Sequence, residues 1–345
     1  MFRVAQTSRI MKRVTNLLFT RRTVMGGILA FLFLTITAVA QQLPREDAVR
    51  IAEFYRLAEQ IQDQVWPNWS KTPAPLLLVT DKTEFLTRHR APPKGFTRVA
   101  EDLYARPRQF DTHLLATFPA FGPPAIIVIG QAQNTDAKAS TPWLITLMHE
   151  HFHQLQDGQP GYFETVEQLG LSGGDTTGMW MLNYPFPYER PEVVTSFSKL
   201  RDLLLNSLVM SDPKEFRKIA AEYVTQRRKV FAQLSPNDHK YLVFQLWQEG
   251  IARYTQIKAA ETAANYQPTV DYAALPDYEP FAAYAKRART ETLDELREAD
   301  IGKLKRIFVY SFGAAEGLLL DRLNPDWKSE YFKHPLSTDA LFDVK

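Results

Sequence analysis

The spacing of apolar residues predicts helix and strand in turn over the first half of the chain. Apolar residues recur at helical spacing over 44–66, which predicts an amphipathic helix that prolines then end. The short apolar run 76–80, between proline and aspartate, predicts a buried strand. The strongest strand signal, rich in β-branched residues, covers 125–130. Residues 81–122 give mixed signals.

The pattern from residue 141 onward is almost entirely helical. Ser140-Thr141-Pro142 is typical of a helix start, with hydroxyls at the cap and proline in the first turn. A glycine-rich loop follows at 170–178. Further helices are expected over 191–210, 213–233, 237–263, 291–300 and 303–323. The pattern therefore predicts an α+β fold, with one domain over 41–345 made of an α/β subdomain (41–135) and a helical subdomain (136–345).

The first 40 residues differ from the rest of the chain. They contain six basic residues and no acidic one, and residues 24–40 form an uncharged apolar run that ends Ala38-Val39-Ala40. A basic stretch, an apolar stretch and a small-x-small end are typical of a secretory signal. We therefore expect a periplasmic or secreted protein. The alternative is an uncleaved membrane anchor formed by 24–40, because about 17 apolar residues is the lower limit for spanning a bilayer.

Charge and cysteine content exclude several classes of site. Without the six basic residues of the leader, 35 basic residues stand against 39 acidic ones, so the rest of the chain is slightly acidic. No basic stripe interleaved with aromatics occurs there, which argues against nucleic-acid binding. The chain has no cysteine, which excludes disulfides, thiolate zinc sites, iron–sulfur clusters and a cysteine nucleophile.

Three of the seven histidines fall within five positions of the helix expected after residue 140. His149 and His153 are four apart and project from one face, where they can share a metal ion. Glu150 is turned about 100° from His149 and lies beside such an ion, where it can act as a general base. His151 points to the other side and is expected to be a bystander. The alternative is an ordinary helix, but burying these polar groups without a partner would be costly.

This His-Glu-x-x-His stretch resembles the zincin metallopeptidases, which implies a zincin-like fold, a Zn²⁺ cofactor and a peptide or protein substrate. Catalytic zinc needs a third protein ligand. Trp247-Gln-Glu249-Gly-Ile-Ala-Arg253-Tyr254 resembles the third-ligand helix of gluzincin-type families, which implies that Glu249 is this ligand. A glutamate on an apolar, aromatic helix also calls for a partner, and Gly250 beside it allows another helix to approach closely. The alternative is a surface pair between Glu249 and Arg253.

Other residues compete for roles at this site. Asp175 is the alternative third ligand. Asp157 is a candidate to hold the free N–H of His153, or simply ends the helix. Tyr241, Tyr254 and Tyr310 are candidates to stabilise an oxyanion by donating a phenolic O–H. Glu316-Gly317 repeats the Glu249-Gly250 dipeptide but is expected to be structural. The strand at 125–130 is expected to form the wall of the cleft on which an extended peptide pairs its backbone.

The sequence therefore predicts an exported zinc metallopeptidase in which Glu150 activates the attacking water, with the metal held by His149, His153 and Glu249. Two alternatives stay open. In one, the protein is a non-catalytic module of zincin fold that binds partners in the cell envelope. In the other, the histidines are incidental and the chain is a helical scaffold.

Overall fold

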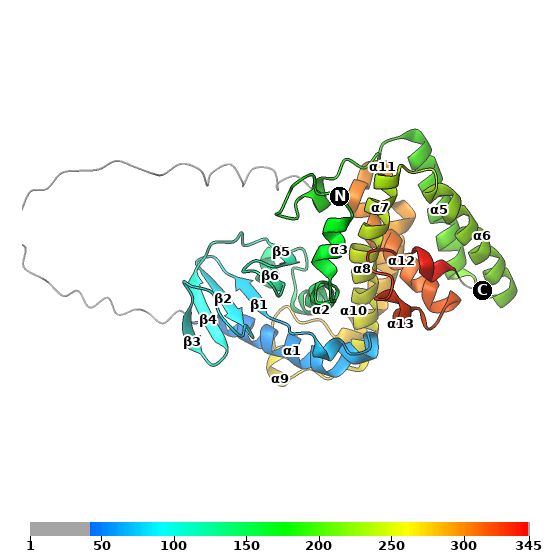
Figure 1. Ribbon diagram of the computed structural model, residues 1–345. Coiled ribbons are helices and arrows are strands. Elements are labelled where there is room, and N and C mark those ends of the chain that lie inside the picture. Colours follow the sequence, from blue (N-terminus) through cyan, green and yellow to red (C-terminus); the bar gives the residue numbers. More distant parts are fainter. Residues whose placement is uncertain (1–41, 344–345) are drawn as a thin grey trace, which may run out of the picture. The chain divides into compact units, whose positions relative to one another are not determined.

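The computed structural model describes residues 42–343, in which six strands form one sheet in the order β3-β4-β2-β1-β6-β5 (Figure 1). β1 pairs antiparallel with β2 and parallel with β6. β1 and β6 are buried throughout, as their continuous apolar runs predict. The strands are β1 (Leu76–Val79), β2 (Thr83–Thr87), β3 (Thr97–Ala100), β4 (Leu103–Pro107), β5 (Leu115–Phe118) and β6 (Ile126–Gly130).

Four of these strands lie in the region of mixed signals. β3 and β5 are the two edge strands and are mostly exposed or half-buried, so they lack a continuous apolar run. β6 was expected to offer a free edge to a peptide, and that prediction is wrong. Its two neighbours are β1 and β5, so both of its edges are already paired. The free edge on this side of the sheet belongs to β5.

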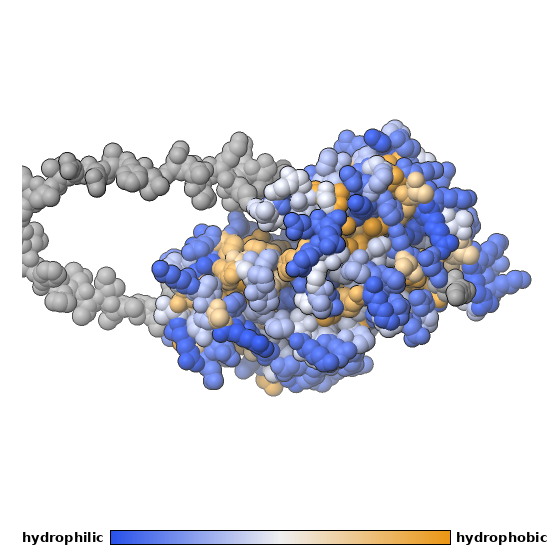
Figure 2. All heavy atoms as spheres, in the orientation of Figure 1, coloured by the Kyte–Doolittle hydropathy of each residue, from blue (hydrophilic) through white to orange (hydrophobic). Residues whose placement is uncertain are grey.

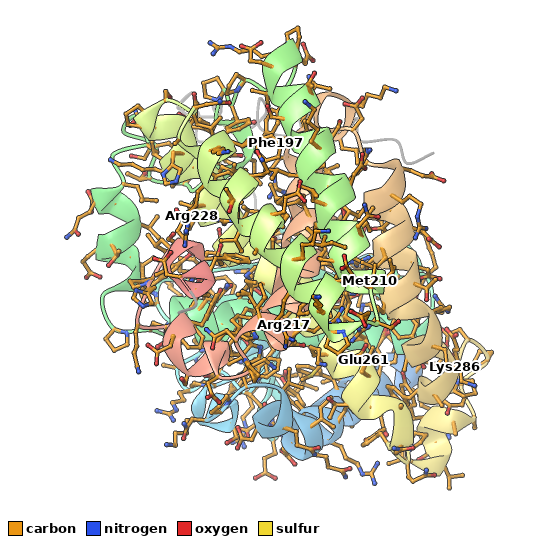
Figure 3. All side chains as sticks on the ribbon, turned by 90° about the vertical axis from the view of Figure 1, so that its right-hand side faces the viewer. Phe197, Met210, Arg217, Arg228, Glu261 and Lys286 are labelled. Atoms are coloured by element: carbon orange, nitrogen blue, oxygen red, sulfur yellow. The ribbon has the colours of Figure 1, made fainter. Side chains whose placement is uncertain are left out.

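The rest of the described chain is mainly helical, which confirms an α+β fold. Figure 1 shows α2 between the sheet and the other large helices. Figure 3 shows α5, which contains Phe197 and is followed by Met210, running antiparallel to α6, which contains Arg217 and Arg228. The helices are α1 (Arg45–Val65), α2 (Ser140–Asp157), α3 (Tyr162–Gln168), α4 (Trp180–Asn183), α5 (Pro191–Val209), α6 (Pro213–Phe231), α7 (Pro236–Gln245), α8 (Ile251–Thr262), α9 (Val270–Ala273), α10 (Phe281–Glu298), α11 (Ile301–Leu304), α12 (Phe308–Leu323) and α13 (Trp327–Tyr331).

Most expected helices are present, with three differences in their limits. The helix expected over 237–263 is interrupted by a π-helical turn, Leu246–Gly250. The one expected over 303–323 is divided by a 3-10 turn, Lys305–Ile307. α10 begins at Phe281, well before the expected residue 291. Its early part has only two large apolar side chains, Phe281 and Tyr284, among alanines and basic residues, which makes it a weak signal in the sequence.

The start of α2 differs from the predicted cap. The N-cap residue is Ala139, and no side chain caps the helix. The Ser140 hydroxyl instead donates to Asp277 at 2.5 Å and accepts from Arg50 at 2.8 Å. The Thr141 hydroxyl donates to the backbone oxygen of Glu279. These hydroxyls therefore tie the start of α2 to α1 and to the segment before α10, which fixes the position of the histidine helix.

The leader and the possible anchor at 24–40 lie outside the described residues. Within residues 42–343, every helix is too short or too polar to span a bilayer. Figure 2 shows a mainly hydrophilic surface over the outer helices, while the hydrophobic residues visible on this face gather over the sheet and the adjoining helices.

Candidate metal centre

The two histidines and Glu249 come together at one point in the protein. His149 and His153 are buried, and their Nε2 atoms lie 3.2 Å apart. Glu249 Oε2 is 3.9 Å from Nε2 of His149 and 3.5 Å from Nε2 of His153. Zinc binds such atoms at about 2.0–2.2 Å, so ligand atoms at two corners of a tetrahedron lie about 3.4 Å apart. The three side chains therefore fit one zinc ion, and no other such group occurs within residues 42–343.

Glu249 reaches this point from a π-helical turn. The turn, Leu246–Gly250, lies between α7 and α8 and adds one residue to the helical repeat. A Cβ atom on Gly250 would lie 2.7 Å from Cα of Gly313 on α12. The expected close approach of another helix at Gly250 is thus confirmed. Such π-turns occur often at functional sites.

Glu249 is not the surface partner of Arg253. Arg253 instead donates to Gln256 at 3.2 Å and to Glu295 at 3.4 Å. Glu249 pairs with Arg306, whose Nη1 lies 3.4 Å from Oε1. Burial would raise the pKa of Glu249, but the hydrogen bond and charge of His153, then the charge of Arg306, lower it below its usual range. Glu249 is therefore held ionised, as a metal ligand must be.

Gln156, and not Asp157, is the residue that accepts a hydrogen bond from the second ring nitrogen of His153. Nδ1 of His153 lies 2.7 Å from Oε1 of Gln156. The amide nitrogen of Gln156 donates to the backbone oxygen of Trp247 at 3.0 Å and to the Tyr331 hydroxyl at 2.7 Å. The Gln156 oxygen must then accept from His153 Nδ1–H, which leaves Nε2 free to bind a metal. Asp157 lies beside the Tyr162 hydroxyl instead.

Glu150 follows His149 on α2, is buried, and lies close enough to His153 and Glu249 for their charges to act on it. Its Oε2 accepts a hydrogen bond of 2.8 Å from the hydroxyl of Thr117, on the edge strand β5. Burial raises the pKa of Glu150, although the charge of His153 and the bond from Thr117 offset part of this effect. A carboxylate with a raised pKa is suited to take up and give back a proton near neutral pH.

Of the three tyrosines, Tyr310 lies at the site. Its ring stacks near the ring of His149, with centroids 6.4 Å apart, and its oxygen accepts from Arg306 at 3.2 Å. The Tyr254 hydroxyl donates to Asp321 at 2.7 Å, and the Tyr241 hydroxyl donates to the backbone oxygen of Met181 at 3.0 Å. Those two hydroxyl protons are therefore committed elsewhere.

The remaining candidates have structural roles. His151 is buried away from the ligands, between Gln154 (2.9 Å) and Gln62 (3.0 Å). Asp175 accepts from the backbone N–H groups of Thr177 and Trp180 in its own loop. It is not part of the ligand group. Glu316 forms a buried ion pair with Arg227, which agrees with the structural role expected for it.

Sequence reasoning missed Thr117, Gln156 and Arg306. Gln156 follows His153 by three residues, so its helical spacing was a usable signal. Thr117 and Arg306 lie on other elements, and nothing in their neighbouring sequence indicates their role.

Comparisons of the chain with models of protein families, with curated proteins and with solved structures found no match. Function must therefore be inferred from the chemistry of this site.

Proposed function

We propose that the protein is a zinc-dependent peptidase of zincin-like fold. The single observation that carries this proposal is the group formed by His149, His153 and Glu249, with Glu150 beside it and outside the ligand set. A zinc ion held there supplies a water of lowered pKa and polarises the substrate carbonyl. Three protein ligands and one open position are typical of catalytic rather than structural zinc.

Glu150 would move the proton in this reaction. Its carboxylate takes a proton from the attacking water as the C–O bond forms. It then passes this proton to the amine nitrogen as the C–N bond breaks. The hydroxyl of Thr117 lies 2.8 Å from Oε2 and 2.9 Å from the backbone oxygen of Glu150, and by sharing its proton between them it orients the carboxylate before substrate binds. Tyr310, whose ring lies beside that of His149, would donate its O–H to the oxygen that becomes negative once this proton turns away from Glu249.

An extended peptide is the substrate that this surface suits best. The edge strand β5 has unpaired backbone groups on one side and also supplies Thr117. Two partly exposed apolar side chains lie close to site residues in the sequence: Leu115, two before Thr117, and Ile307, one after Arg306.

The leader predicted over residues 1–40 would export this activity, which N-terminal sequencing of the mature protein would test.

Purified protein is expected to bind one zinc ion, and His149→Ala or Glu249→Ala should lose it. The matched control is Asp175→Asn, which alters the other acidic candidate and should keep the metal, because that carboxylate serves only its own loop. Elemental analysis after dialysis measures the stoichiometry. Full zinc in Glu249→Ala would refute the third ligand, and no zinc in the unsubstituted protein would refute the metal site.

Zinc binding at pH 7 is expected to release about one proton. In the metal-free protein, burial lowers the pKa of His153, but the hydrogen bond and charge of Glu249 raise it to about 9. Burial and the charge of His153 lower the pKa of His149 to about 3. At pH 7 His153 is therefore the protonated member, and its proton must leave before Nε2 can bind zinc.

Titration calorimetry in buffers of different ionisation enthalpy measures this release. It should decrease as the pH rises through about 9, since His153 is then already neutral. Binding heats that are the same in every buffer at pH 7 would contradict the assignment of the proton to this pair.

A further inference from the structure

We propose that Arg306 is a positioning residue that makes Glu249 a one-oxygen ligand and turns the Tyr310 hydroxyl proton away from itself. This inference rests on the zinc site proposed above and deepens it. It concerns a residue 57 positions from Glu249 in the sequence and on a different element.

The two oxygens of Glu249 have different partners. Oε2 faces Nε2 of both His149 and His153, at 3.9 and 3.5 Å, whereas Oε1 faces Nη1 of Arg306 at 3.4 Å. A carboxylate with both oxygens free can bind a metal through either one or both. Zinc with three protein ligands and one water needs a single oxygen from Glu249. Arg306 occupies the second oxygen and so favours this arrangement.

Arg306 also determines which way the Tyr310 proton points. Nη2 of Arg306 donates to the Tyr310 oxygen at 3.2 Å. A phenol has one O–H and otherwise only lone pairs, and an arginine can only donate. The Tyr310 proton must therefore point away from Arg306. Burial, the charge of Glu249 and a hydrogen bond with Glu249 raise the pKa of Tyr310, so the acceptor on the side to which this proton points is the Glu249 carboxylate.

The geometry requires an arginine and not merely a positive charge. The guanidinium contacts three acceptors at once: the side-chain oxygen of Gln245 at 3.2 Å, Glu249 Oε1 at 3.4 Å and the Tyr310 hydroxyl at 3.2 Å. These acceptors belong to α7, the π-helical turn and α12, so one planar group links the three elements. A lysine supplies a point charge but not this fork.

The backbone before Arg306 is shaped to place it. Lys305 has a φ of 52°, in the left-handed region that non-glycine residues seldom adopt. This residue lies between α11 and α12, and its side chain pairs with Glu189 at 3.0 Å. The side chains of Arg306 and Glu249 are only 22% and 16% exposed, so water screens their attraction less than it screens a surface pair.

Three variants test the inference: Arg306→Gln, Arg306→Lys and the matched control Arg253→Gln. Arg253 has a similar exposure of 25% and lies one turn from Glu249, but it contacts Gln256 and Glu295 instead. Zinc affinity is measured by competition with a chromogenic chelator. The absorption spectrum of the protein loaded with cobalt(II) reports the coordination number, and circular dichroism confirms folding.

Arg306→Gln is expected to weaken zinc binding about 10- to 100-fold, as loss of an outer-shell partner typically does. The visible absorption of its cobalt(II) form should become weaker, because both oxygens of Glu249 can then bind the metal and five-coordinate cobalt absorbs less strongly than four-coordinate cobalt. Arg306→Lys should lose less affinity yet show the same spectral change, because it keeps the charge without the fork. It supplies the spectral test should Arg306→Gln not fold. Arg253→Gln should change zinc affinity far less than Arg306→Gln, because its charge acts on His149 only from a distance, and should leave the cobalt spectrum unchanged.

Unchanged zinc affinity and cobalt spectra in both Arg306 variants would overturn the inference while leaving the zinc site intact. An equal loss in Arg253→Gln would also overturn it, because any nearby positive charge would then suffice. Absence of zinc binding in the unsubstituted protein would instead refute the site itself, and the inference with it.

Discussion

Glu150→Gln is expected to lower peptide hydrolysis by about 10²- to 10⁴-fold while zinc stays bound. The amide has nearly the same size as the carboxylate and can still accept the hydrogen bond from Thr117. It cannot take a proton from water. Because Glu150 lies outside the ligand group, the variant should keep its metal. Hydrolysis of a mixture of synthetic peptides, followed by mass spectrometry, gives the rate, and elemental analysis gives the zinc content.

The control for this prediction is Asp175→Asn, which also exchanges one carboxylate for an amide. Asp175 serves only its own loop, so this variant should keep both zinc and activity. Loss of zinc in Glu150→Gln would make Glu150 a ligand and contradict its role as a base. A zinc-loaded Glu150→Gln with full activity would require another base. No hydrolysis by the zinc-loaded unsubstituted protein would instead favour the non-catalytic binding module.

The elements that the sequence predicts well are those whose pattern is long or fully apolar. α1 and α2 have repeated apolar positions over several turns, and β1 and β6 are buried on both faces. The other strands are as short as β1 and β6 but lack their uninterrupted apolar sequence. Two of them are edges whose exposed residues give no apolar run. Their places in the sheet depend on pairing with distant strands, which local spacing cannot show.

At the candidate site, the predictable part is what one helix can arrange by itself. The four-residue spacing of His149 and His153 determines their shared face, and an acidic residue on an apolar, aromatic helix made Glu249 conspicuous. The residues around them depend on tertiary contacts. Arg306 meets Glu249 only because α12 packs against the π-helical turn, where Gly250 and Gly313 nearly touch. The sequence shows the two glycines but not that they meet.

The buried pair of Arg227 and Glu316 is expected to be the most costly one to break, at about 3–5 kcal/mol for Arg227→Met. Their side chains are 3% and 1% exposed, and Nε of Arg227 lies 2.6 Å from Oε1 of Glu316. The Tyr223 hydroxyl donates to the same oxygen at 2.6 Å. Without Arg227, Glu316 is left charged or forced to protonate inside α12. Chemical denaturation measures the change in the free energy of unfolding.

The neighbouring Arg228 (labelled in Figure 3) supplies the control, because it pairs with Asp343 on the surface, where the two side chains are 59% and 66% exposed. Arg228→Met should therefore cost less than about 1 kcal/mol. The double variant Arg227→Met/Glu316→Leu should recover part of the loss, since an apolar pair needs no compensating charge, while the buried Tyr223 hydroxyl loses its acceptor. Equal effects of the two single variants would contradict this account. Folded Arg227→Met should still bind zinc, because Glu316 stabilises α12 without taking part in the metal centre.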